Sequence, residues 1–238
     1  MKIKTMLAVV GLISAMAIPV WAEQSPNLAI TADTLSYDGT TGKASATGNI
    51  VITKDDKVMT GATGWYNTKT EEAYLGGGVS MMGTNMSLSA STLHSYNNSE
   101  IEADGSVHLT KDNKQVFGNK VTYNTKTEYA TVVGDAKLVM DDDVLTANEI
   151  QGNIGGIDVT ATGNVTLNSA KRNLSATADS AQYTQTPGQN NGVAYLRGNA
   201  HTVQNGNVLN APELRINLAD NSAQTEGGRS TLIITPQQ

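Results

Sequence analysis

The sequence predicts an all-β protein built from about seven repeats of about 29 residues, each contributing two strands that stack on those of its neighbours. Two markers in phase with each other carry this prediction. The first is an apolar residue, any residue and then Ala or Gly, and its copies lie 29, 29, 28, 29, 29 and 35 residues apart. The second is a glycine, followed in most copies by a polar or small residue and then an aliphatic one. Internal repeats indicate a stacked architecture, because one unit cannot bury its apolar face alone. The first marker occupies residues 30–32, 59–61, 88–90, 116–118, 145–147, 174–176 and 209–211, and the second begins at Gly48, Gly77, Gly105, Gly134, Gly163, Gly198 and Gly227.

The residues around each marker glycine alternate between apolar and polar, as a half-buried strand requires. In the fifth repeat Val159, Val165 and Leu167 fall on one face, with polar residues between them. The glycine falls on the same inward face in every copy, where a strand would prefer bulk, and so indicates a bend, a bulge or a close backbone approach. A straight segment of about 11 residues would run roughly 36 Å, longer than the common strand. We therefore expect the longer strand of each repeat to fold into a V at its glycine.

Turn-forming residues separate the expected strands, at residues 37–39, 67–69, 97–99 and 124–126. The single 35-residue step contains the sequence Thr-Pro-Gly-Gln-Asn-Asn at residues 186–191, which we interpret as an inserted, exposed loop. No segment shows a sustained helical period. A leucine-rich repeat is excluded, because its Leu spacing and its helical half have no counterpart here.

A stack of strands leaves two open sheet edges, and open edges are templates for pairing with another chain. We expect assembly edges at both ends of the domain. Their residues are Ile30, Ala32 and Leu35 at one end and Leu232, Ile233 and Ile234 at the other.

The N-terminus has the pattern of an export signal: a basic start at Lys2 and Lys4, an apolar stretch, and a small-residue cleavage site before Glu23. The apolar stretch of 17 residues is at the lower limit for crossing a bilayer, so an uncleaved membrane anchor stays as the alternative. Export would place the mature protein outside the cytoplasm. The expected division is a cleaved signal peptide at 1–22, a lead-in at 23–29, a single β domain at 30–235 and a tail at 236–238.

Charge and composition exclude several classes of function. The chain carries a formal charge of −6, and loss of the signal peptide leaves 14 basic residues against 22 acidic ones. Without clustered Lys and Arg, no nucleic-acid partner is indicated. Without cysteine, neither a disulfide framework nor a thiolate metal site is available. The remaining 216 residues are long enough to bury a sizeable core as one domain.

The polar residues give little support for catalysis or metal binding. His94, His108 and His201 lack the paired spacing of a metal site. Residues 141–143, three consecutive aspartates, lack the Gly and Glu of a calcium loop, so we interpret them as a solvated turn. We therefore expect no metal and no catalytic residue.

Two further groups of residues have ordinary structural interpretations. Glu102 and Asp104 lie two apart on an outward face, where acidic residues are the usual expectation rather than an enzyme's carboxylate pair. No phosphate-binding glycine loop is present, so we expect no nucleotide cofactor and assign any ATP-driven step to a partner. A tyrosine recurs before the turns, where packing over a rung end is favoured over stacking on sugars: Tyr37, Tyr66, Tyr123 and Tyr183.

Together these residues resemble a known family. The first marker, the recurring tyrosine and the second marker at 48–50, 134–136, 163–165 and 198–200 are similar to the repeats of the OstA-like (LptA) family of periplasmic lipopolysaccharide-transport proteins. The resemblance covers Ile30 to about Gly228. It implies a slightly twisted β-jellyroll whose two sheets enclose an apolar groove for the acyl chains of lipid A. It further implies head-to-tail joining of edge strands into a bridge between the inner and outer membranes, with the membrane components of the transport machinery as partners.

The chain has more repeats than a simple bridge protein, so a fused version, an anchored assembly factor or a shuttle for another envelope lipid stays open. Small inward residues would either leave a channel, where an acyl chain gains about 0.8 kcal/mol per buried methylene, or let the sheets pack dry. The residues alone favour neither; the resemblance favours the channel over a structural or adhesive solenoid. The expected lipid-binding residues are Ile50, Ile52, Leu75, Val79, Ile101, Val107, Leu109, Val132, Leu138, Val159, Val165, Leu167 and Leu196.

Overall fold

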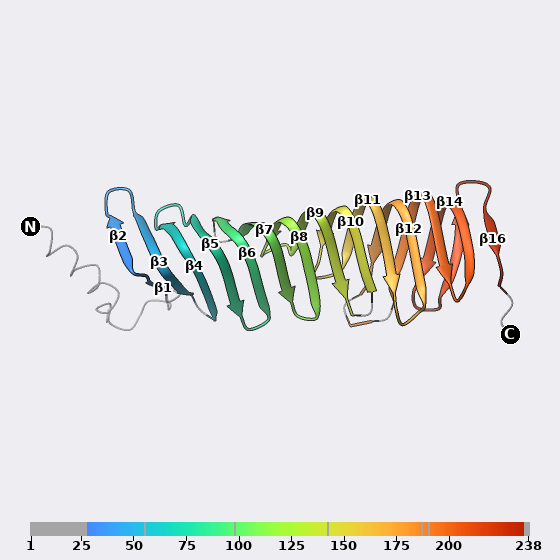
Figure 1. The fold of residues 1–238 in the computed structure, drawn as a ribbon, viewed down its shortest axis with the longest axis horizontal. Coiled ribbons are helices and arrows are strands. Elements are labelled where there is room, and N and C mark those ends of the chain that lie inside the picture. The colour runs from blue at the N-terminus through green and yellow to red at the C-terminus, as the bar shows by residue number, and fades with distance from the viewer. Residues whose placement is uncertain are drawn as a thin grey trace, which may run out of the picture.

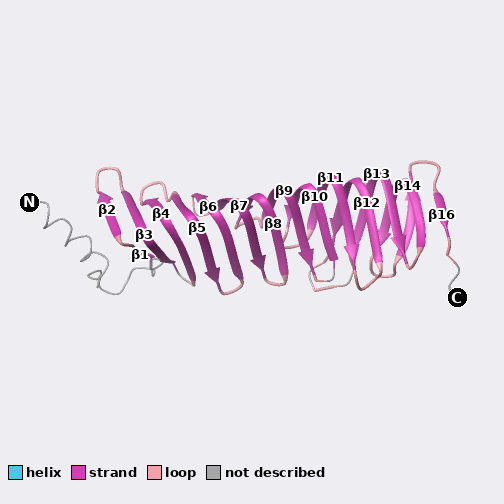
Figure 2. Cartoon of the chain, in the orientation of Figure 1, coloured by secondary structure: helices cyan, strands magenta, loops and turns pink. Residues whose placement is uncertain are grey.

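A computed structural model describes residues 28–235, except residues 55, 98, 142, 187 and 190. The expected signal peptide at 1–22, most of the lead-in and the tail at 236–238 lie outside the described residues. Within them the regular elements are strands joined by turns, and no helix is long and apolar enough to cross a membrane. Figure 2 shows the strands following one another along an elongated molecule.

The described residues form 16 strands, and they lie side by side in chain order along the long axis (Figure 1). Their bounds are β1 (Leu28–Thr31), β2 (Thr34–Asp38), β3 (Lys43–Lys54), β4 (Lys57–Asn67), β5 (Ala73–Gly83), β6 (Met86–Tyr96), β7 (Glu100–Lys111), β8 (Lys114–Asn124), β9 (Tyr129–Met140), β10 (Asp143–Asn153), β11 (Asp158–Ser169), β12 (Leu174–Thr184), β13 (Val193–Gln204), β14 (Asn207–Asn217), β15 (Ser222–Glu226) and β16 (Thr231–Ile233).

All strands belong to one antiparallel sheet, in which each long strand pairs with the strands before and after it in the chain. At each end the long strand is replaced by two short ones. β1 and β2 both pair with β3, and β15 and β16 both pair with β14. The predicted all-β, repeat-built stack of antiparallel strands is therefore confirmed.

A bulge bends each odd-numbered strand from β3 to β13 near its middle, and the pairing register of the even-numbered strands shifts opposite it. On β11 the register of pairing shifts between Thr162 and Val165, and the two residues between them have positive φ, 77° at Gly163 and 52° at Asn164. A Cβ on Gly163 would lie 2.5 Å from Nδ2 of Asn148 on β10. Left-handed backbone suits glycine first and asparagine next, which explains the Gly-Asn pairs of the second marker.

The bend corrects one expectation about the marker glycine. Strict alternation placed Gly163 on the inward face, but its positive φ turns it toward the exposed Asn148 instead. The inward phase is the same on both sides of the bulge: Ala161 before it and Val165 after it both point into the core, at most 1% exposed. Each V thus has two arms with apolar inner faces.

The two arms of each V end at different turns. One arm ends at a short turn, such as residues 84–85 between β5 and β6, and the other at a longer turn, such as residues 125–128 between β8 and β9. We call these the short-turn edge and the long-turn edge, and the gap between them the mouth. The space between the arms holds the core, whose residues include Leu109, Leu138, Leu167, Leu196 and Leu214, none more than 1% exposed.

Counted between the second-marker glycines, the 35-residue step from Gly163 to Gly198 contains two insertions rather than one. The loop between β12 and β13 spans residues 185–192, and Gly188 and Gln189 within it are exposed as predicted. A second insertion lies at the short-turn edge, where the turn between β11 and β12 spans residues 170–173 instead of two residues. It moves the register shift of β12 to just after Ala178, which pairs with Val165. The sixth copy of the first marker, at 174–176, therefore ends two residues before that shift instead of directly at it.

Candidate functional site

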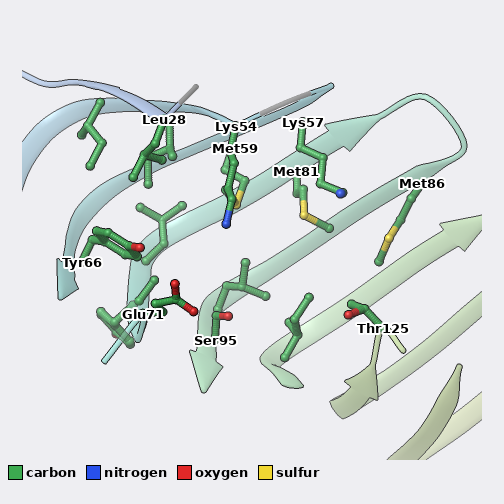
Figure 3. Close-up of a pocket in the computed structure, with 17 residues that line it drawn as sticks. Leu28, Lys54, Lys57, Met59, Tyr66, Glu71, Met81, Met86, Ser95 and Thr125 are labelled. Carbon is green, nitrogen blue, oxygen red and sulfur yellow. The ribbon is translucent and has the colours of Figure 1, made fainter. Parts of the chain in front are cut away.

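A cavity of about 300 Å³ lies between the arms at the N-terminal end of the stack (Figure 3). Strands β1 and β3 to β7 surround it. Aliphatic side chains line its interior: Ile30, Ile52, Leu75, Leu93 and Ile101. Strand alternation brings these side chains together, because each stands on the inner face of its arm.

Three methionines supply a further part of the wall. Met59, Met81 and Met86 come from β4, β5 and β6, and Figure 3 shows them along the arm that ends at the short-turn edge. Methionine is unbranched and polarizable, so it fits irregular apolar shapes and repacks at modest cost. Such a wall can accept a flexible apolar chain.

The cavity reaches the mouth of the V, where its lining becomes polar. Lys54 and Lys57 flank the turn between β3 and β4, while Glu71, Ser95 and Thr125 lie toward the long-turn edge (Figure 3). An apolar interior below a charged rim suits an amphiphile, which places its tail inside and its polar group at the rim.

Tyr66 lines the cavity near this rim. Burial, and secondly the nearby Glu71, raises the pKa of its phenol. The hydroxyl therefore stays protonated and able to donate a hydrogen bond at neutral pH.

Beyond the cavity, polar contacts join the two edges across the mouth. Lys111 at the end of β7 pairs with Glu128 in the long turn after β8. The Nζ of Lys114 donates to the carbonyl of Gly155, 2.9 Å away in the long turn after β10. The hydrogen bond to Glu128 raises the pKa of Lys111, so this ammonium group stays charged.

All thirteen residues expected to bind lipid lie on the inner side of the arms. Ile52 and Ile101 are half-buried against the core, and the other eleven are buried. Ile52, Leu75 and Ile101 line the cavity. The other ten belong to the core, at Ile50, Val79, Val107, Leu109, Val132, Leu138, Val159, Val165, Leu167 and Leu196.

The three methionines of the cavity wall, Met59, Met81 and Met86, are not among the residues expected from the sequence to bind lipid. A signal for them exists in the sequence, because four of the eight methionines fall between residues 59 and 86. Alternation identified the inner face correctly but gave no measure of the distance between the arms, which decides where a cavity forms.

The expected assembly edges lie on the terminal strands. Ile30 is in β1 and pairs with Ile52, Leu35 is in β2 and is 41% exposed, and Ala32 lies between these strands. At the other end, Leu232 and Ile233 are in β16 and Ile234 follows it, each more than half exposed. The role of these edges in assembly stays a prediction.

The histidines have ordinary partners. His94 Nε2 lies 2.8 Å from Glu72 Oε1, His108 stacks on Phe117 at 4.2 Å between ring centroids, and His201 lies 2.6 Å from Asn210. Among the residues that the structure describes, no group of three or more His, Cys, Asp or Glu could hold a metal ion.

Glu102 lies as expected, whereas the recurring tyrosines differ among themselves in burial. Glu102 forms an ion pair with Lys120 at 2.9 Å, as expected of a wet sheet face. Tyr123 and Tyr183 are buried, in accord with packing over the rung ends, whereas Tyr37 is 45% exposed.

The prediction that residues 141–143 form a solvated turn is wrong for Asp143. This residue begins β10 and is 4% exposed, whereas Asp141 is exposed. The carboxylate of Asp143 has charged and polar partners that lie 29 and 40 residues further along the chain, at Arg172 and Tyr183. Local composition cannot reveal partners at that separation.

Comparison with known proteins shows a match to one protein family. Residues 29–156 match the family described as LptA/(LptD N-terminal domain) LPS transport protein, a range that contains every cavity residue except Leu28. No curated protein sequence matches the chain. Among solved structures the chain is similar to LptH from Pseudomonas aeruginosa, described as the LptA homologous periplasmic component of the conserved lipopolysaccharide transport device. The two are 15% identical, the match covers 88% of this chain and 95% of LptH, and the TM-score is 0.24, too low to carry an argument.

Proposed function

Since the chain belongs to the LptA/LptD N-terminal domain family of lipopolysaccharide-transport proteins, we propose that it carries lipopolysaccharide by sheltering acyl chains of lipid A in the cavity between its two arms. The observation that carries this proposal is the apolar cavity of about 300 Å³ with its charged rim. Ligand sites in proteins commonly measure about 300–1,000 Å³, so this one has the size of a small site.

The energetics favour an acyl chain as the occupant. Each buried methylene contributes about 0.8 kcal/mol, so a handful of methylenes in the cavity supplies a binding energy of several kcal/mol. The ammonium groups of Lys54 and Lys57 at the rim suit an anionic headgroup, although the protein as a whole is acidic. The cavity thus divides a lipid into a buried tail and a solvated head.

Adjacent residues on β4 provide a matched test of this proposal. Met59 faces the cavity, whereas Val58 is 40% exposed on the other face of the same strand. Met59→Glu places a carboxylate against the acyl chain and should cost at least about 1.4 kcal/mol, a tenfold loss of affinity. Val58→Glu adds the same charge and should bind as the wild type does.

The measurement is native mass spectrometry of each purified variant with added lipopolysaccharide, with circular dichroism to verify folding. A folded Met59→Glu variant that binds as tightly as Val58→Glu would refute the cavity as the lipid site. Wild-type protein that neither contains nor binds lipopolysaccharide would favour the dry structural solenoid instead.

We place the protein in the periplasm, exported by a signal peptide that is cleaved after Ala22, with the membrane components of the same transport system as partners. The sequence pattern of residues 1–22 supports this placement. N-terminal sequencing of the protein from its envelope should begin at Glu23. Retention of Met1 or Lys2 would support the anchored alternative.

The arrangement of the short strands at the two ends of the stack supports head-to-tail assembly of copies. β1 and β16 both belong to the arm at the short-turn edge, and β2 and β15 both belong to the other arm. Pairing of β16 with β1 of the next copy would therefore continue the V without a break. Such a chain of copies forms the bridge between membranes.

A charged edge should prevent this pairing. Substituting Leu232→Lys and Ile234→Lys should shift the protein from oligomers to monomers in size-exclusion chromatography with light scattering. Val133→Lys is the control, because Val133 is 44% exposed in the middle of the stack. Equal oligomer fractions in both variants would contradict the proposed edge contact.

A further inference from the structure

Thioether sulfur is concentrated at the cavity. Five of the eight methionines follow residue 22, and three of these five line the cavity, at Met59, Met81 and Met86. We call these three residues the cavity methionines. The chain has no cysteine, so any reaction of the protein with a sulfur oxidant takes place at methionine.

The cavity methionines are neighbours on three adjacent strands (Figure 3). Met59 on β4 pairs directly with Met81 on β5, and Met86 begins β6 two residues before Leu88, the partner of Met81. Beyond the cavity the same inner row of paired residues continues with branched side chains, at Leu88, Leu109, Val116, Leu138, Leu145 and Leu167. On this row, Met59 and Met81 therefore stand where the space between the arms is hollow, and branched residues follow where it is filled.

Two of the cavity methionines are within reach of solvent. Met59 and Met86 are half-buried, whereas Met81 is 3% exposed. The cavity reaches the mouth of the V and measures about 300 Å³, so a molecule of the size of a peroxide can enter it. The remaining two methionines are internal references, because Met82 is 66% exposed on the outer face of β5 and Met140 is 2% exposed in the core.

A peroxide converts a thioether to a sulfoxide without any further reactant. The sulfur lone pair attacks one peroxide oxygen, and an S–O bond forms as the O–O bond breaks. The attacked oxygen passes its proton to the departing hydroxide, which leaves as water. Sulfur loses two electrons and the peroxide gains them. The product is a polar group in place of an apolar one.

Sulfoxides in this cavity would oppose the binding of an acyl chain. A sulfoxide oxygen accepts hydrogen bonds, but the aliphatic side chains of the interior, such as Ile52 and Leu75, have no donor to offer. Water in the cavity would serve as the donor. An acyl chain that displaces this water leaves the oxygen unpaired, which is unfavourable.

From these contacts, and resting on the proposed function, we propose that Met59 and Met86 form an oxidation site that closes the lipid cavity to acyl chains. Peroxide reaches their sulfur atoms when no lipid is bound, and the sulfoxides then exclude lipid. A bound acyl chain covers the same sulfur atoms, so lipid and oxidant compete for the cavity. Reduction by a methionine sulfoxide reductase restores the site.

Peptide mapping by mass spectrometry tests the site on purified protein treated with hydrogen peroxide, with and without saturating lipopolysaccharide. Without lipid, Met59 and Met86 should each gain one oxygen, whereas the buried Met140 should stay unmodified. Lipopolysaccharide should slow the oxidation of Met59 and Met86 severalfold and leave that of Met82 unchanged. If Met59 and Met86 stay unmodified without lipid while Met82 is fully oxidised, the inference is overturned.

Native mass spectrometry with added lipopolysaccharide tests the consequence for binding. The oxidised protein should bind at least about tenfold more weakly than the untreated protein. In the matched control Met82→Leu, from the outer face, peroxide should cause the same loss. In the double variant Met59→Leu with Met86→Leu, compared with its own untreated sample, peroxide should cause little loss, because leucine has no sulfur. Equal losses in the two variants would contradict the inference.

The remaining outcomes distinguish the inference from the proposed function. Loss of binding that circular dichroism shows to accompany unfolding would overturn the inference, as would unchanged binding by protein whose Met59 and Met86 are sulfoxides; both results leave the proposed function intact. Untreated protein that does not bind lipopolysaccharide would overturn the proposed function and the inference with it. The same holds if bound lipopolysaccharide leaves Met59 and Met86 unprotected.

Discussion

The bulge of β5 contains two consecutive glycines with nearly equal φ and different surroundings. Gly77 and Gly78 both have left-handed backbone, with φ of 83° and 84°. A Cβ on Gly77 would lie 2.6 Å from Cβ of Ala62 on β4, whereas a Cβ on Gly78 would meet nothing within 4 Å. Substitution of each glycine by alanine therefore separates backbone strain from steric overlap.

The expected magnitudes follow from these contacts. A left-handed conformation costs an alanine about 1–2 kcal/mol, and both variants carry this cost. Only Gly77→Ala adds the overlap, and neither of the two Cβ atoms can move without its backbone. Overpacking of this kind costs about 1–3 kcal/mol. For a domain of this size, 1 kcal/mol corresponds to about 2–4 °C in melting temperature, so Gly77→Ala should melt roughly 2–12 °C below Gly78→Ala.

Thermal unfolding followed by circular dichroism measures this difference. Adding Ala62→Gly to Gly77→Ala removes the overlapping atom and should recover most of the loss, apart from about 0.5–1 kcal/mol for a new glycine in a strand. The double-mutant cycle isolates the contact between the two positions. Equal melting temperatures for the two single variants, or no recovery in the double variant, would refute steric closeness at the corner.

Two further predictions concern the core and the buried Tyr183. Leu167 is fully buried, so Leu167→Ala should lower the free energy of unfolding by about 2–5 kcal/mol in urea titrations; Leu35→Ala, at a 41% exposed position, should change it by less than about 0.5 kcal/mol, and equal changes would contradict the assignment of the core. Burial, and secondly the charge of Asp143, raises the pKa of Tyr183 above its ordinary value of 10.0, so the folded protein keeps a proton that the unfolded chain loses. This contribution to stability is complete below pH 10 and declines above it by up to about 1.4 kcal/mol per pH unit. Tyr183→Phe should therefore show a shallower decline between pH 10 and 11, and equal slopes would show that the phenol is not held protonated.

The sequence was sufficient to predict the elements of the candidate site but not the site itself. Ile52, Leu75 and Ile101 were assigned to the inner face by alternation, and the structure places all three in the cavity wall. Leu167 and Leu196 satisfied the same pattern and belong to the closed core. Alternation reports which way a side chain faces, whereas the width between the arms depends on side-chain volumes and contacts across the mouth.

The buried polar contacts of Asp143 could not be predicted from the sequence, for a related reason. Asp143 has the composition of a solvated turn, yet its ion pair with Arg172 and its hydrogen bond from Tyr183 are buried. These residues are brought together by the folding of the sheet into a V, and no local rule relates them. The same holds for the second insertion, because only the strand register shows that two residues were added at 170–173.

The sequence by itself determined the repeat, the strand character, the bend at each marker glycine and the position of the exposed edges. These features are local, because side-chain alternation and left-handed backbone depend on neighbours in the chain. Only the tertiary structure decided where the space between the arms stays hollow, near Met59 and Met81, and where buried side chains fill it, at Leu167 and Leu196. The physical reason is that a cavity and a filled core are both properties of two surfaces at a given distance. That distance is fixed by contacts between residues far apart in sequence.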